Sequence, residues 1–408
     1  MKGFQKLIPV DQALKTFLAA VPSKKPKTVS VTLTSALNRV LAENVIAKED
    51  LPRFDRSAVD GYAVKARDTT SASQFKPKTL RIVEDRVDSM QAKQVWTGNP
   101  IPKGADSVVM LENTEKNKDE VKIWVQLTPS ENVSKKGEDL AKGETALRSG
   151  IRLKAHHLGL TAALGKTEIK IFEKPSVGVL ATGNELAEMG SIPQAYQIFD
   201  SNKVMVSSLC RELGAEPVDL GIAKDDVDDI VGRLKRGLKK TDCMITTGGT
   251  SVGAADLVPE SVNMIGNPGV IVHGVAMRPG MPTALAVVEE KPVIILSGNP
   301  VAAIFGFEVF ARPLISRMIG LERTELRSVV EARITKRTTA ALGRRTFVRV
   351  HVSQSEHGFS AAPISAKGSG LISTMTKANG YVVVPENREG LEEGETVYAY
   401  LFDDVEVG

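Results

Sequence analysis

Short apolar runs alternate with stretches of helical period through the second half of the chain, between residues 175 and 322. Such runs are typical of buried parallel strands, and the stretches between them place apolar residues three and four positions apart, as amphipathic helices do. The predicted strands lie at 176–181, 218–221, 243–245, near 270 and in a hairpin over 283–296. Helices are predicted between them and at 300–318. This alternation predicts a doubly wound α/β domain over residues 175–322.

The rest of the chain follows other patterns. Residues 10–21 repeat apolar positions at helical spacing and predict an amphipathic helix. A second helix is predicted at 37–41, leading into an extended segment at 45–46. Short alternating runs predict an inserted β-rich domain over residues 48–140. Such runs return from residue 327 with glycine-rich turns between them, which predicts a small C-terminal β-barrel.

Composition narrows the class of protein. The chain has 408 residues and 42% apolar content, which suits about two to four domains. Its 53 basic and 49 acidic residues nearly balance and only 5% of residues are aromatic, so nothing indicates nucleic-acid binding. Cys210 and Cys243 form neither a disulfide framework nor a zinc pattern and are expected to be buried thiols. No signal peptide or membrane span is recognisable, which predicts a soluble, cytoplasmic protein.

The predicted strand at 243–245 lies in the stretch with the most distinctive chemistry, D-C-M-I-T-T-G-G-T-S-V-G-A-A-D over residues 242–256. Gly248 and Gly249 lack Cβ atoms, so the backbone there can turn sharply and bring its N–H groups close to an anion. Thr250 and Ser251 add hydroxyls. A strand that ends in this way is typical of a phosphate site at the carboxyl edge of a sheet, although a plain turn has the same composition.

A second anion site is predicted after the strand at 293–296, where the sequence continues Ser297, Gly298, Asn299 and Pro300. Asn299 can cap the following helix, and Pro300 suits its first position. A helix N-terminus is therefore expected beside a glycine loop, which again favours an anion. A purely structural helix start explains the same residues equally well.

Acidic residues follow the same predicted strand ends. Because parallel strands end at one edge of a sheet, the loops that carry these acids and glycines are expected to meet. Phosphate suits the glycine loops but would be repelled by Glu185, Asp225, Asp226 and Asp256. A Mg²⁺ ion resolves this conflict because it bridges carboxylates and phosphate oxygens. The expected substrate is therefore a phosphorylated, nucleotide-linked small molecule. Neither a Walker A sequence nor a dinucleotide fingerprint occurs, which disfavours ATPase and hydride-transfer chemistry.

Seven motifs occur in a fixed order along nearly the whole chain: F-D-R-S-A-V-D-G-Y-A-V (54–64), T-G-N-P-I-P-K-G-A-D (97–106), G-E-D (137–139), T-G-N-E-L (182–186), T-T-G-G-T-S-V-G-A-A-D (246–256), M-R-P-G-M-P (277–282) and S-G-N-P-V-A-A (297–303). Together they resemble the molybdopterin molybdenumtransferases, the molybdenum-insertion enzymes of molybdenum cofactor synthesis, which are similar to the E domain of gephyrin. The resemblance implies four domains. They are an elongated domain (1–47 with 141–174), the inserted β-rich domain (48–140), the α/β domain (175–322) and the β-barrel (323–408).

The resemblance also implies the reaction and the assembly. Adenylated molybdopterin and molybdate would be the substrates, and cleavage of the phosphoanhydride would release AMP and leave molybdenum on the dithiolene. Mg²⁺ would be required. The family forms homodimers, with the active site between the α/β domain of one subunit and the inserted domain of the other. Molybdopterin adenylyltransferase is a further expected partner.

Roles for individual residues follow from the resemblance. Catalysis is implied for Asp60, Asp139, Glu185 and Asp256, the first two acting from the partner subunit. Metal binding is implied for Glu185, Asp256 and either Asp225 or Asp226. Substrate contacts are implied for Asp55, Thr97, Thr182, Gly183, Gly248, Gly249, Thr250, Ser251, Arg278, Ser297, Gly298, Asn299, Pro300, Arg344 and Ser369. Arg278 and Met281 stand where the family often has lysines, so a guanidinium fork replaces one point charge and the other basic contact is lost.

Three alternatives stay open on sequence alone. A molybdopterin adenylyltransferase shares the T-G-G-T-S-bearing α/β fold but is a lone domain, so the acidic motifs before residue 175 disfavour it. A scaffold without turnover is disfavoured by the joint presence of Asp60, Asp139, Glu185 and Asp256. Tungstate could replace molybdate, because the two are tetrahedral dianions of nearly equal size.

Overall fold

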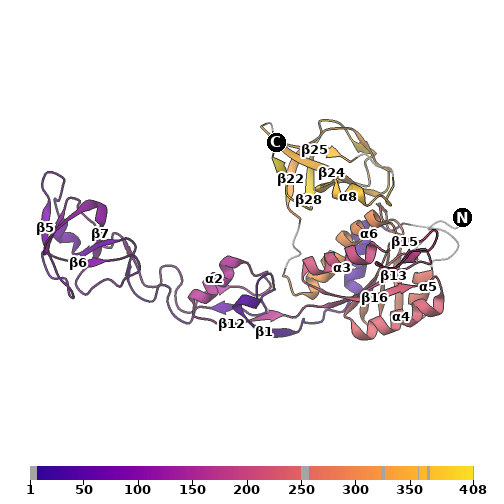
Figure 1. Ribbon diagram of the computed structural model, residues 1–408, viewed down its shortest axis with the longest axis horizontal. Helices are drawn as coiled ribbons and strands as arrows, with labels where there is room; N and C mark the ends of the chain where they lie inside the picture. The colour runs from indigo at the N-terminus through magenta and orange to yellow at the C-terminus, as the bar shows by residue number, and fades with distance from the viewer. Residues whose placement is uncertain (1–6, 250–256, 323–326, 357, 365–367, 408) are drawn as a thin grey trace. The chain divides into compact units, whose positions relative to one another are not determined.

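The computed structural model describes residues 7–249, 257–322, 327–356, 358–364 and 368–407 (Figure 1). The chain divides into two compact units, residues 1–29 with 172–408 and residues 30–171. The first unit contains an α/β domain and a β-barrel, and the second contains a mixed β-sheet with smaller β-pairs. No helix among the described residues is long and apolar enough to cross a membrane.

The α/β domain is built on a six-stranded sheet in the order β16-β13-β17-β21-β20-β18. The first four strands run parallel, and β20 and β18 extend the sheet by antiparallel pairing. The bounds are β13 Ser176–Thr182, β16 Glu216–Ala223, β17 Cys243–Thr247, β18 Pro268–His273, β20 Ala284–Val288 and β21 Lys291–Leu296. The predicted parallel sheet and hairpin are therefore confirmed.

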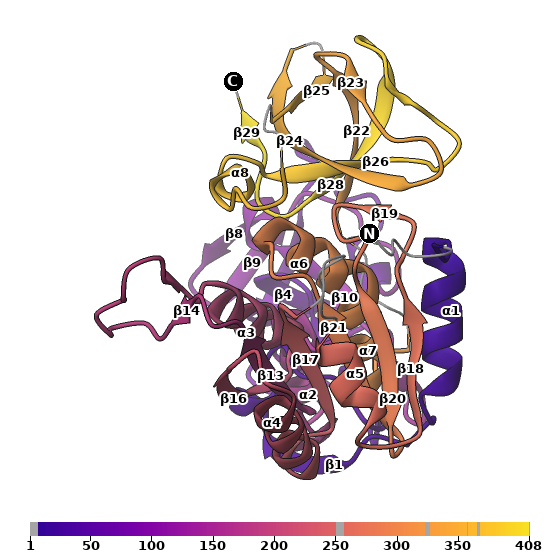
Figure 2. The same cartoon turned by 90° about the vertical axis from the view of Figure 1, so that its right-hand side faces the viewer.

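Helices cover both faces of this sheet (Figure 2). α3 packs on β13 and β16 and contacts α6 and α7, whereas α4 packs on β13, β16 and β17 and contacts α5. The chain crosses from β13 to β16 through α3 and returns past β13 to β17 through α4, and right-handed crossovers in opposite directions lie on opposite faces. The bounds are α1 Val10–Ala20, α3 Asn202–Leu213, α4 Val227–Lys240, α5 Leu257–Asn263, α6 Pro300–Gly306 and α7 Arg312–Met318. The doubly wound architecture is confirmed.

Local sequence explains where these helices begin and end. Asp226 caps α4 by accepting a hydrogen bond from the N–H of Asp229 at 2.9 Å. α3 ends at Gly214, whose φ of +91° is a left-handed conformation that glycine adopts without strain. The buried face of α4 packs Ile230 and Leu234 into the core of the domain.

The helix predicted at 300–318 is interrupted. α6 and α7 are joined by a π-helical turn, Phe307–Ala311. Pro313 lies in the first turn of α7 and has no N–H to donate to the carbonyl of residue 309, which accounts for a break in the hydrogen-bond ladder at this point.

The C-terminal strands close into a barrel. β24, β25, β22, β28 and β26 pair in succession, and β26 pairs again with β24. The bounds are β22 Val329–Ile334, β24 Arg345–Ser355, β25 Gly358–Pro363, β26 Gly380–Val384 and β28 Thr396–Leu401, with smaller elements β19 Met277–Arg278, β23 Thr338–Thr339, α8 Ser373–Thr376, β27 Gly390–Leu391 and β29 Glu406–Val407. The predicted barrel is confirmed.

Aromatic and ionic contacts join the barrel to the α/β domain. Phe305 of α6 stacks on Phe347 of β24 with ring centroids 4.9 Å apart. Tyr381 of β26 packs edge-on against the Phe305 ring, with centroids 5.3 Å apart. Nearby, the buried Glu308 carboxylate accepts hydrogen bonds from Arg312 and Arg327 at 2.7 to 3.2 Å. The barrel therefore packs against α6 and the π-helical turn that follows it.

The second unit contains a six-stranded sheet in the order β7-β4-β6-β5-β9-β8. Its strands are β4 Gly61–Val64, β5 Lys78–Ile82, β6 Gln91–Val95, β7 Ser107–Met110, β8 Thr114–Asn117 and β9 Glu120–Ile123. The rest of the chain in this region forms smaller elements: β1 Thr28–Thr32, β2 Val45–Ile46, β3 Arg56–Ser57, β10 Val133–Ser134, β11 Thr145–Leu147, α2 Ala155–Ala163 and β12 Glu168–Phe172. The prediction of β-rich structure in this region is confirmed.

The helix predicted at 37–41 is wrong. A short 3₁₀ turn, Leu33–Ser35, occurs instead, and Val40 and Leu41 form isolated β-bridges to Arg152 and Ile171. Leu41 is fully buried in a core shared with Ile171, so pairing with a distant segment outweighs the weak helical preference of five residues.

Candidate active site

The four parallel strands of the α/β domain end side by side. Thr182 of β13 lies opposite Ala223 of β16, and Thr247 of β17 lies opposite Leu296 of β21. Backbone hydrogen bonds continue beyond the strands, from Gly183 N–H to the Ala223 carbonyl and from Gly248 N–H to the Leu296 carbonyl, each at 3.1 Å. The loops that sequence analysis singled out therefore begin at one edge of the sheet.

Two glycine loops lie side by side at this edge, because they follow the paired strands β17 and β21. Gly248 has a φ of +90°, and a Cβ there would lie 2.4 Å from the carbonyl oxygen of Thr182. Gly249 has a φ of +65°, and a Cβ there would lie 2.4 Å from a methyl of Val258. A Cβ on Gly298 would lie 3.5 Å from the Gly248 Cα. Glycine is thus required at 248 and 249 by both backbone conformation and close approach.

The acidic residues at this edge have different hydrogen-bond partners. Asp225 and Asn184 bind each other reciprocally: Asp225 Oδ2 accepts the Asn184 N–H at 3.0 Å, and Asn184 Oδ1 accepts the Asp225 N–H at 3.2 Å. Asp226 instead caps α4. The Glu185 carboxylate lies back over Gly183, where a Cβ would come within 2.5 Å of it. Asp225 and Glu185 are thus brought together by adjacent loops, whereas Asp226 serves the helix.

Three predicted residues, Thr250, Ser251 and Asp256, lie outside the described residues. Within the described ranges, no group of three or more acidic, histidine or cysteine side chains gathers as a metal site would require. Of the four carboxylates predicted to hold Mg²⁺, the described part of the chain therefore offers Glu185 and Asp225 on neighbouring loops, with Asp226 engaged as a cap.

Two predicted arginines lie on neighbouring segments where the barrel joins the α/β domain. β19 pairs in parallel with β24, which places Arg278 opposite Thr346, two residues beyond Arg344. Ser369 lies at the start of α6, because its carbonyl accepts the Val301 N–H at 3.1 Å. Both loosely matched barrel residues, Arg344 and Ser369, therefore adjoin segments of the α/β domain that carry predicted substrate residues.

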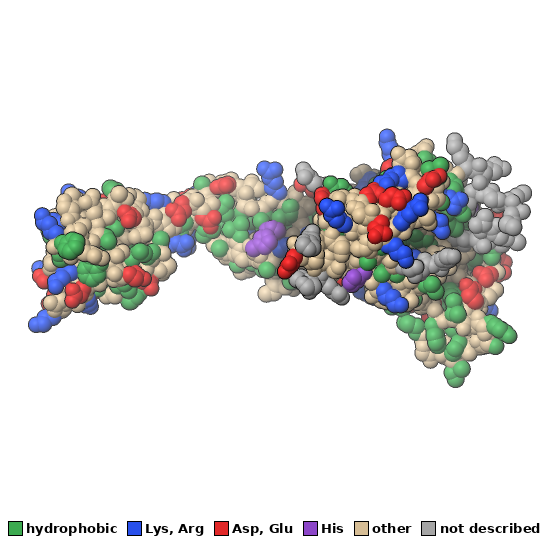
Figure 3. Space-filling view, turned by 90° about the horizontal axis from the view of Figure 1, so that it is seen from above, with side chains coloured by type: hydrophobic (Ala, Val, Ile, Leu, Met, Phe, Trp, Pro, Cys, Tyr) green, Lys and Arg blue, Asp and Glu red, His purple; other side chains and the backbone are tan. Residues whose placement is uncertain are grey.

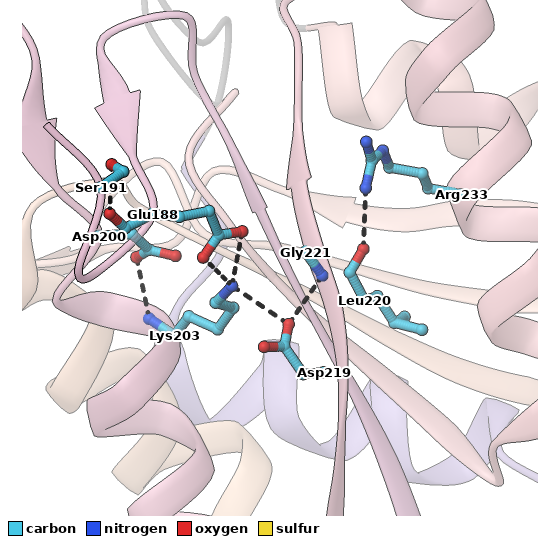
Figure 4. Close-up of polar contacts among 8 residues, drawn as sticks. All are labelled: Glu188, Ser191, Asp200, Lys203, Asp219, Leu220, Gly221 and Arg233. Carbon is cyan, nitrogen blue, oxygen red and sulfur yellow. Dashed lines mark hydrogen bonds and ion pairs between the residues drawn. The ribbon is translucent and has the colours of Figure 1, made fainter. Parts of the chain in front are cut away.

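The first turn of α3 anchors this edge, a role that sequence analysis missed. Asn202 donates from Nδ2 to the Gly298 carbonyl at 2.7 Å. Lys203 is buried, and its Nζ contacts Glu188 at 3.0 Å and Asp219 at 3.2 Å (Figure 4). Burial alone would lower the pKa of the Lys203 ammonium, but the two carboxylates raise it above its ordinary value. In the sequence, the one sign of this role was the Asp-Ser-Asn run at the predicted N-cap, residues 200–202.

Asp200 precedes this turn and is almost fully buried. One carboxylate oxygen accepts the Lys203 N–H at 3.1 Å, and the other has no hydrogen-bond partner among the described residues. Burial raises the pKa of Asp200 above its ordinary value, despite this bond and the nearby ammonium. The Asp200 carboxyl is therefore held in a state that favours the proton more than a surface carboxyl does.

An apolar loop projects beside this turn. β14 (Leu186–Ala187) pairs in parallel with β15 (Ile198–Phe199), and we call the segment between and including these strands the 186–199 loop. Figure 3 shows apolar side chains grouped on its surface, where Ile192 and Tyr196 are 95% and 98% exposed. The loop follows directly after Glu185, whose carbonyl accepts the Ile198 N–H at 2.8 Å.

The remaining predicted residues lie in the second unit. Asp60 Oδ1 accepts both the N–H and the hydroxyl of Thr97, each at 2.7 Å, and these bonds hold the pKa of Asp60 below its ordinary value. Asp55 accepts the Lys136 N–H at 2.8 Å and the Lys135 ammonium at 3.1 Å. Asp139 is exposed, and its N–H bonds the carbonyl of Leu51. Asp60 and Thr97 thus form one small polar centre.

Three family descriptions cover this architecture in order. The MoeA N-terminal region (domain I and II) matches residues 8–165, the probable molybdopterin binding domain matches 178–317, and the MoeA C-terminal region (domain IV) matches 331–402. The α/β domain with its glycine loops thus defines a multidomain protein built around a molybdopterin-binding fold.

Relatives cover the chain from end to end. The molybdopterin molybdenumtransferase of Bacillus subtilis is 35% identical over 97% of this chain and 94% of its own, and that of Staphylococcus aureus (strain MSSA476) is 33% identical over 96% and 94%. The crystal structure of a molybdopterin biosynthesis MoeA protein from Pyrococcus horikoshii has a TM-score of 0.84 and 31% identity, and covers 97% of this chain and all of the other. The chain belongs to the molybdopterin molybdenumtransferase (MoeA) family, which confirms the resemblance seen in the sequence.

Proposed function

We propose that the protein transfers molybdate into adenylated molybdopterin, with release of AMP, to form molybdenum cofactor. One observation carries the proposal: glycine loops suited to phosphate and arginines suited to an oxyanion lie on neighbouring segments of one unit. The loops with Gly248 and Gly298 follow the paired strands β17 and β21, and the segment with Arg278 pairs with the strand after Arg344. A reaction that brings a phosphorylated substrate and a metal oxyanion together in one site needs both.

The phosphate side of the substrate would be bound by backbone groups. The conformations of Gly248 and Gly249 leave no room for side chains, so the loop backbone that follows the Gly248 N–H, which itself bonds the Leu296 carbonyl, can approach phosphate oxygens closely. The buried Ser297 hydroxyl and the Asn202-anchored carbonyl of Gly298 fix the neighbouring loop. Thr250 and Ser251 complete the predicted phosphate contacts.

The oxyanion side would be bound by guanidinium groups. Molybdate carries two negative charges on four oxygens, and arginine offers forked N–H donors that match such a geometry. Arg278 and Arg344 approach from two different domains, and Ser369 follows from the barrel loop that contacts α6. The same groups would bind tungstate, so the metal must be settled by assay.

Mg²⁺ fits the carboxylates at this edge by the chemistry of its ligands. Hard divalent cations prefer carboxylate oxygens, and when bound Mg²⁺ lowers the repulsion between these acids and phosphate. Glu185 and Asp225 would hold it together with Asp256. Asp225 is preferred to Asp226 because the Asp226 carboxylate already caps α4.

We further infer a homodimer in which Asp60 and Asp139 of one subunit act on the substrate bound by the other. Support comes from the division of the predicted site residues between two units and from the exposed 186–199 loop. Exposed apolar groups of this kind mark interaction surfaces. In this arrangement Asp55 and Thr97 would contact substrate from the same subunit as Asp60.

The decisive experiment measures AMP release from adenylated molybdopterin, with molybdate and Mg²⁺ present and each omitted in turn. Release that requires both supports the proposal, and release that persists in excess chelator would sink the role of the divalent ion. If tungstate supports AMP release and molybdate does not, the oxyanion substrate is tungstate. An absence of release under every condition would favour a scaffold without turnover.

A further inference from the structure

We propose that the α/β domain has a second ligand site, which binds an organic anion with an apolar body, at the sheet edge opposite the candidate active site. A pocket of about 260 Å³ lies there. Its lining includes Pro175 and Asp242, which immediately precede β13 and β17, and Lys291, which opens β21. Parallel strands that begin here end at the other edge, so the pocket shares no residue with the glycine loops.

The floor of the pocket is apolar. It is lined by Val21 at the end of α1, by Leu314 and Met318 of α7, and by Pro22, Pro26 and Pro292. Proline rings are rigid, and Leu314 belongs to the buried core, so this surface is already formed without a ligand. An apolar body would bury it, and a small inorganic ion would not.

Two cations in the wall are held by carbonyl groups at helix ends. Arg317 donates to the carbonyls of Leu18 and Val21 at 2.8 and 3.1 Å, at the C-terminus of α1. Lys291 donates to the carbonyls of Leu238 and Thr241, at the C-terminus of α4. A helix C-terminus carries only about half of an elementary negative charge, so each cation keeps part of its positive charge.

The rim adds further positive charge. Six basic and three acidic side chains line the pocket, and two of those acids are already engaged. Glu290 pairs with Lys24 at 2.8 Å, and Asp242 accepts the N–H and hydroxyl of Ser176, each at 2.7 Å. Lys25, Lys27 and Lys174 are exposed, and no described residue forms an ion pair with them. With six basic and three acidic side chains, the lining has a net charge of +3, so the pocket joins an apolar floor to a wall and rim with an excess of positive charge.

The site would also act on the chain segments that leave this unit. The chain passes from this unit to residues 30–171 after Val29 and returns at Phe172. Lys27 lies just before the first connection and Glu173 just after the second, and the Glu173 N–H donates to the Lys27 carbonyl at 2.8 Å. Both segments line the pocket. A bound anion that contacts Lys27 and Lys174 would therefore hold them together, which gives the protein a place for a regulatory ligand apart from its substrates.

The test titrates the full-length protein with anilinonaphthalene sulfonate, a fluorescent probe that has an apolar body and one negative charge. We expect saturable binding, displacement by octanoate and no displacement by inorganic phosphate. The triple variant Lys25→Glu, Lys27→Glu, Lys174→Glu should bind the probe about tenfold more weakly or worse, as three reversed charges of modest individual worth predict. Met318→Trp, which fills the floor, should weaken binding as well.

Two controls make the outcome unambiguous. A matched triple reversal of exposed lysines in the other unit, Lys76→Glu, Lys103→Glu, Lys116→Glu, should leave probe binding unchanged. Ile192→Ser with Tyr196→Ser tests the apolar 186–199 loop as the competing location. Circular dichroism confirms that each variant is folded. Absence of saturable binding, displacement by phosphate alone, or loss of signal only in the loop variant would each overturn the proposal, whatever the outcome of the AMP-release assay.

Discussion

Asp60, a predicted catalytic residue, and Thr97, a predicted substrate residue, form a well-defined contact. The Thr97 N–H and hydroxyl both bond one oxygen of Asp60 and hold its pKa below the ordinary value. Thr97→Val removes the hydroxyl and keeps both the N–H and the shape of the side chain. We therefore expect the pKa of Asp60 to rise, as followed by NMR titration of its carboxyl carbon.

The same change should alter the pH dependence of AMP release. If ionised Asp60 is needed, a higher pKa means that the carboxylate is lost at a higher pH, so the acid limb of the activity profile moves upward in pH. Thr97→Ser keeps the hydroxyl and is the matched control. A profile that moves equally in both variants would show that the hydroxyl bond is not the cause.

Gly248 makes a second prediction at the residue scale. Its φ of +90° and the 2.4 Å approach of a Cβ to the Thr182 carbonyl both disfavour any side chain. Gly248→Ala should therefore destabilise the protein by about 1–3 kcal/mol, measured as the free energy of unfolding in urea. Gly190 has a φ of +83° with nothing within 4 Å of a Cβ, so Gly190→Ala isolates the conformational cost and should destabilise less. Equal losses would argue against close approach at Gly248.

At the scale of elements, the barrel depends on Glu308. The Glu308 side chain is 4% exposed and is shared by Arg312 and Arg327, whose side chains are 13% and 17% exposed. Glu308→Gln leaves two largely buried guanidinium groups without a carboxylate and should destabilise the protein by about 3–5 kcal/mol. Glu392, which pairs with Arg337 at the surface, is the control, and Glu392→Gln should cost less than about 1 kcal/mol.

The effect of Glu308 should also depend on pH. Burial by itself raises the pKa of Glu308, but the two arginines lower it below the ordinary value of 4.5. A carboxyl group with a depressed pKa in the folded state stabilises above its unfolded pKa, and this contribution is lost as pH falls through the folded value. The difference in unfolding free energy between parent and Glu308→Gln should therefore shrink below about pH 4. A difference that stays constant with pH would contradict this origin.

Local signals explain why most elements were predictable and others were not. The cap at Asp226 and the glycine at 214 act within one helical turn, so the sequence pattern contains them. The bond from Asn202 to Gly298 joins residues 96 positions apart, and no local pattern contains it. The failed helix at 37–41 has the same cause, because Leu41 pairs with a segment 130 positions away.

The candidate site likewise contains some features that local sequence predicts and others that depend on distant contacts. Parallel-strand topology predicted that the glycine loops and acids would share an edge, and those among the described residues do so because each loop follows a strand of one sheet. The approach of Arg278 to the barrel rests on the pairing of β19 with β24, which periodicity could not reveal. Arg344 and Ser369 were found only through family resemblance. Asn202 and Lys203 were missed because an N-cap sequence explains them without any further role.

At the scale of the whole molecule, the predicted site residues fall in two units. Asp60, Thr97 and Asp139 belong to residues 30–171, whereas the glycine loops and arginines belong to the other unit. In the proposed dimer each site draws these two sets from different subunits. A subunit that carries Asp60→Asn and one that carries Asp256→Asn would then be damaged in different halves of the site.

Mixing these two inactive variants separates the proposed dimer from a site within one chain. In a mixed dimer one site carries both substitutions and the other carries neither, so random exchange should restore about a quarter of the parent AMP release. A site built within one chain would stay damaged in every subunit and recover nothing. Subunit exchange must be verified, for example by capture of one tag and detection of a second. Verified exchange without recovery would place Asp60 and Asp256 in the same chain's site and would remove the partner subunit from the mechanism.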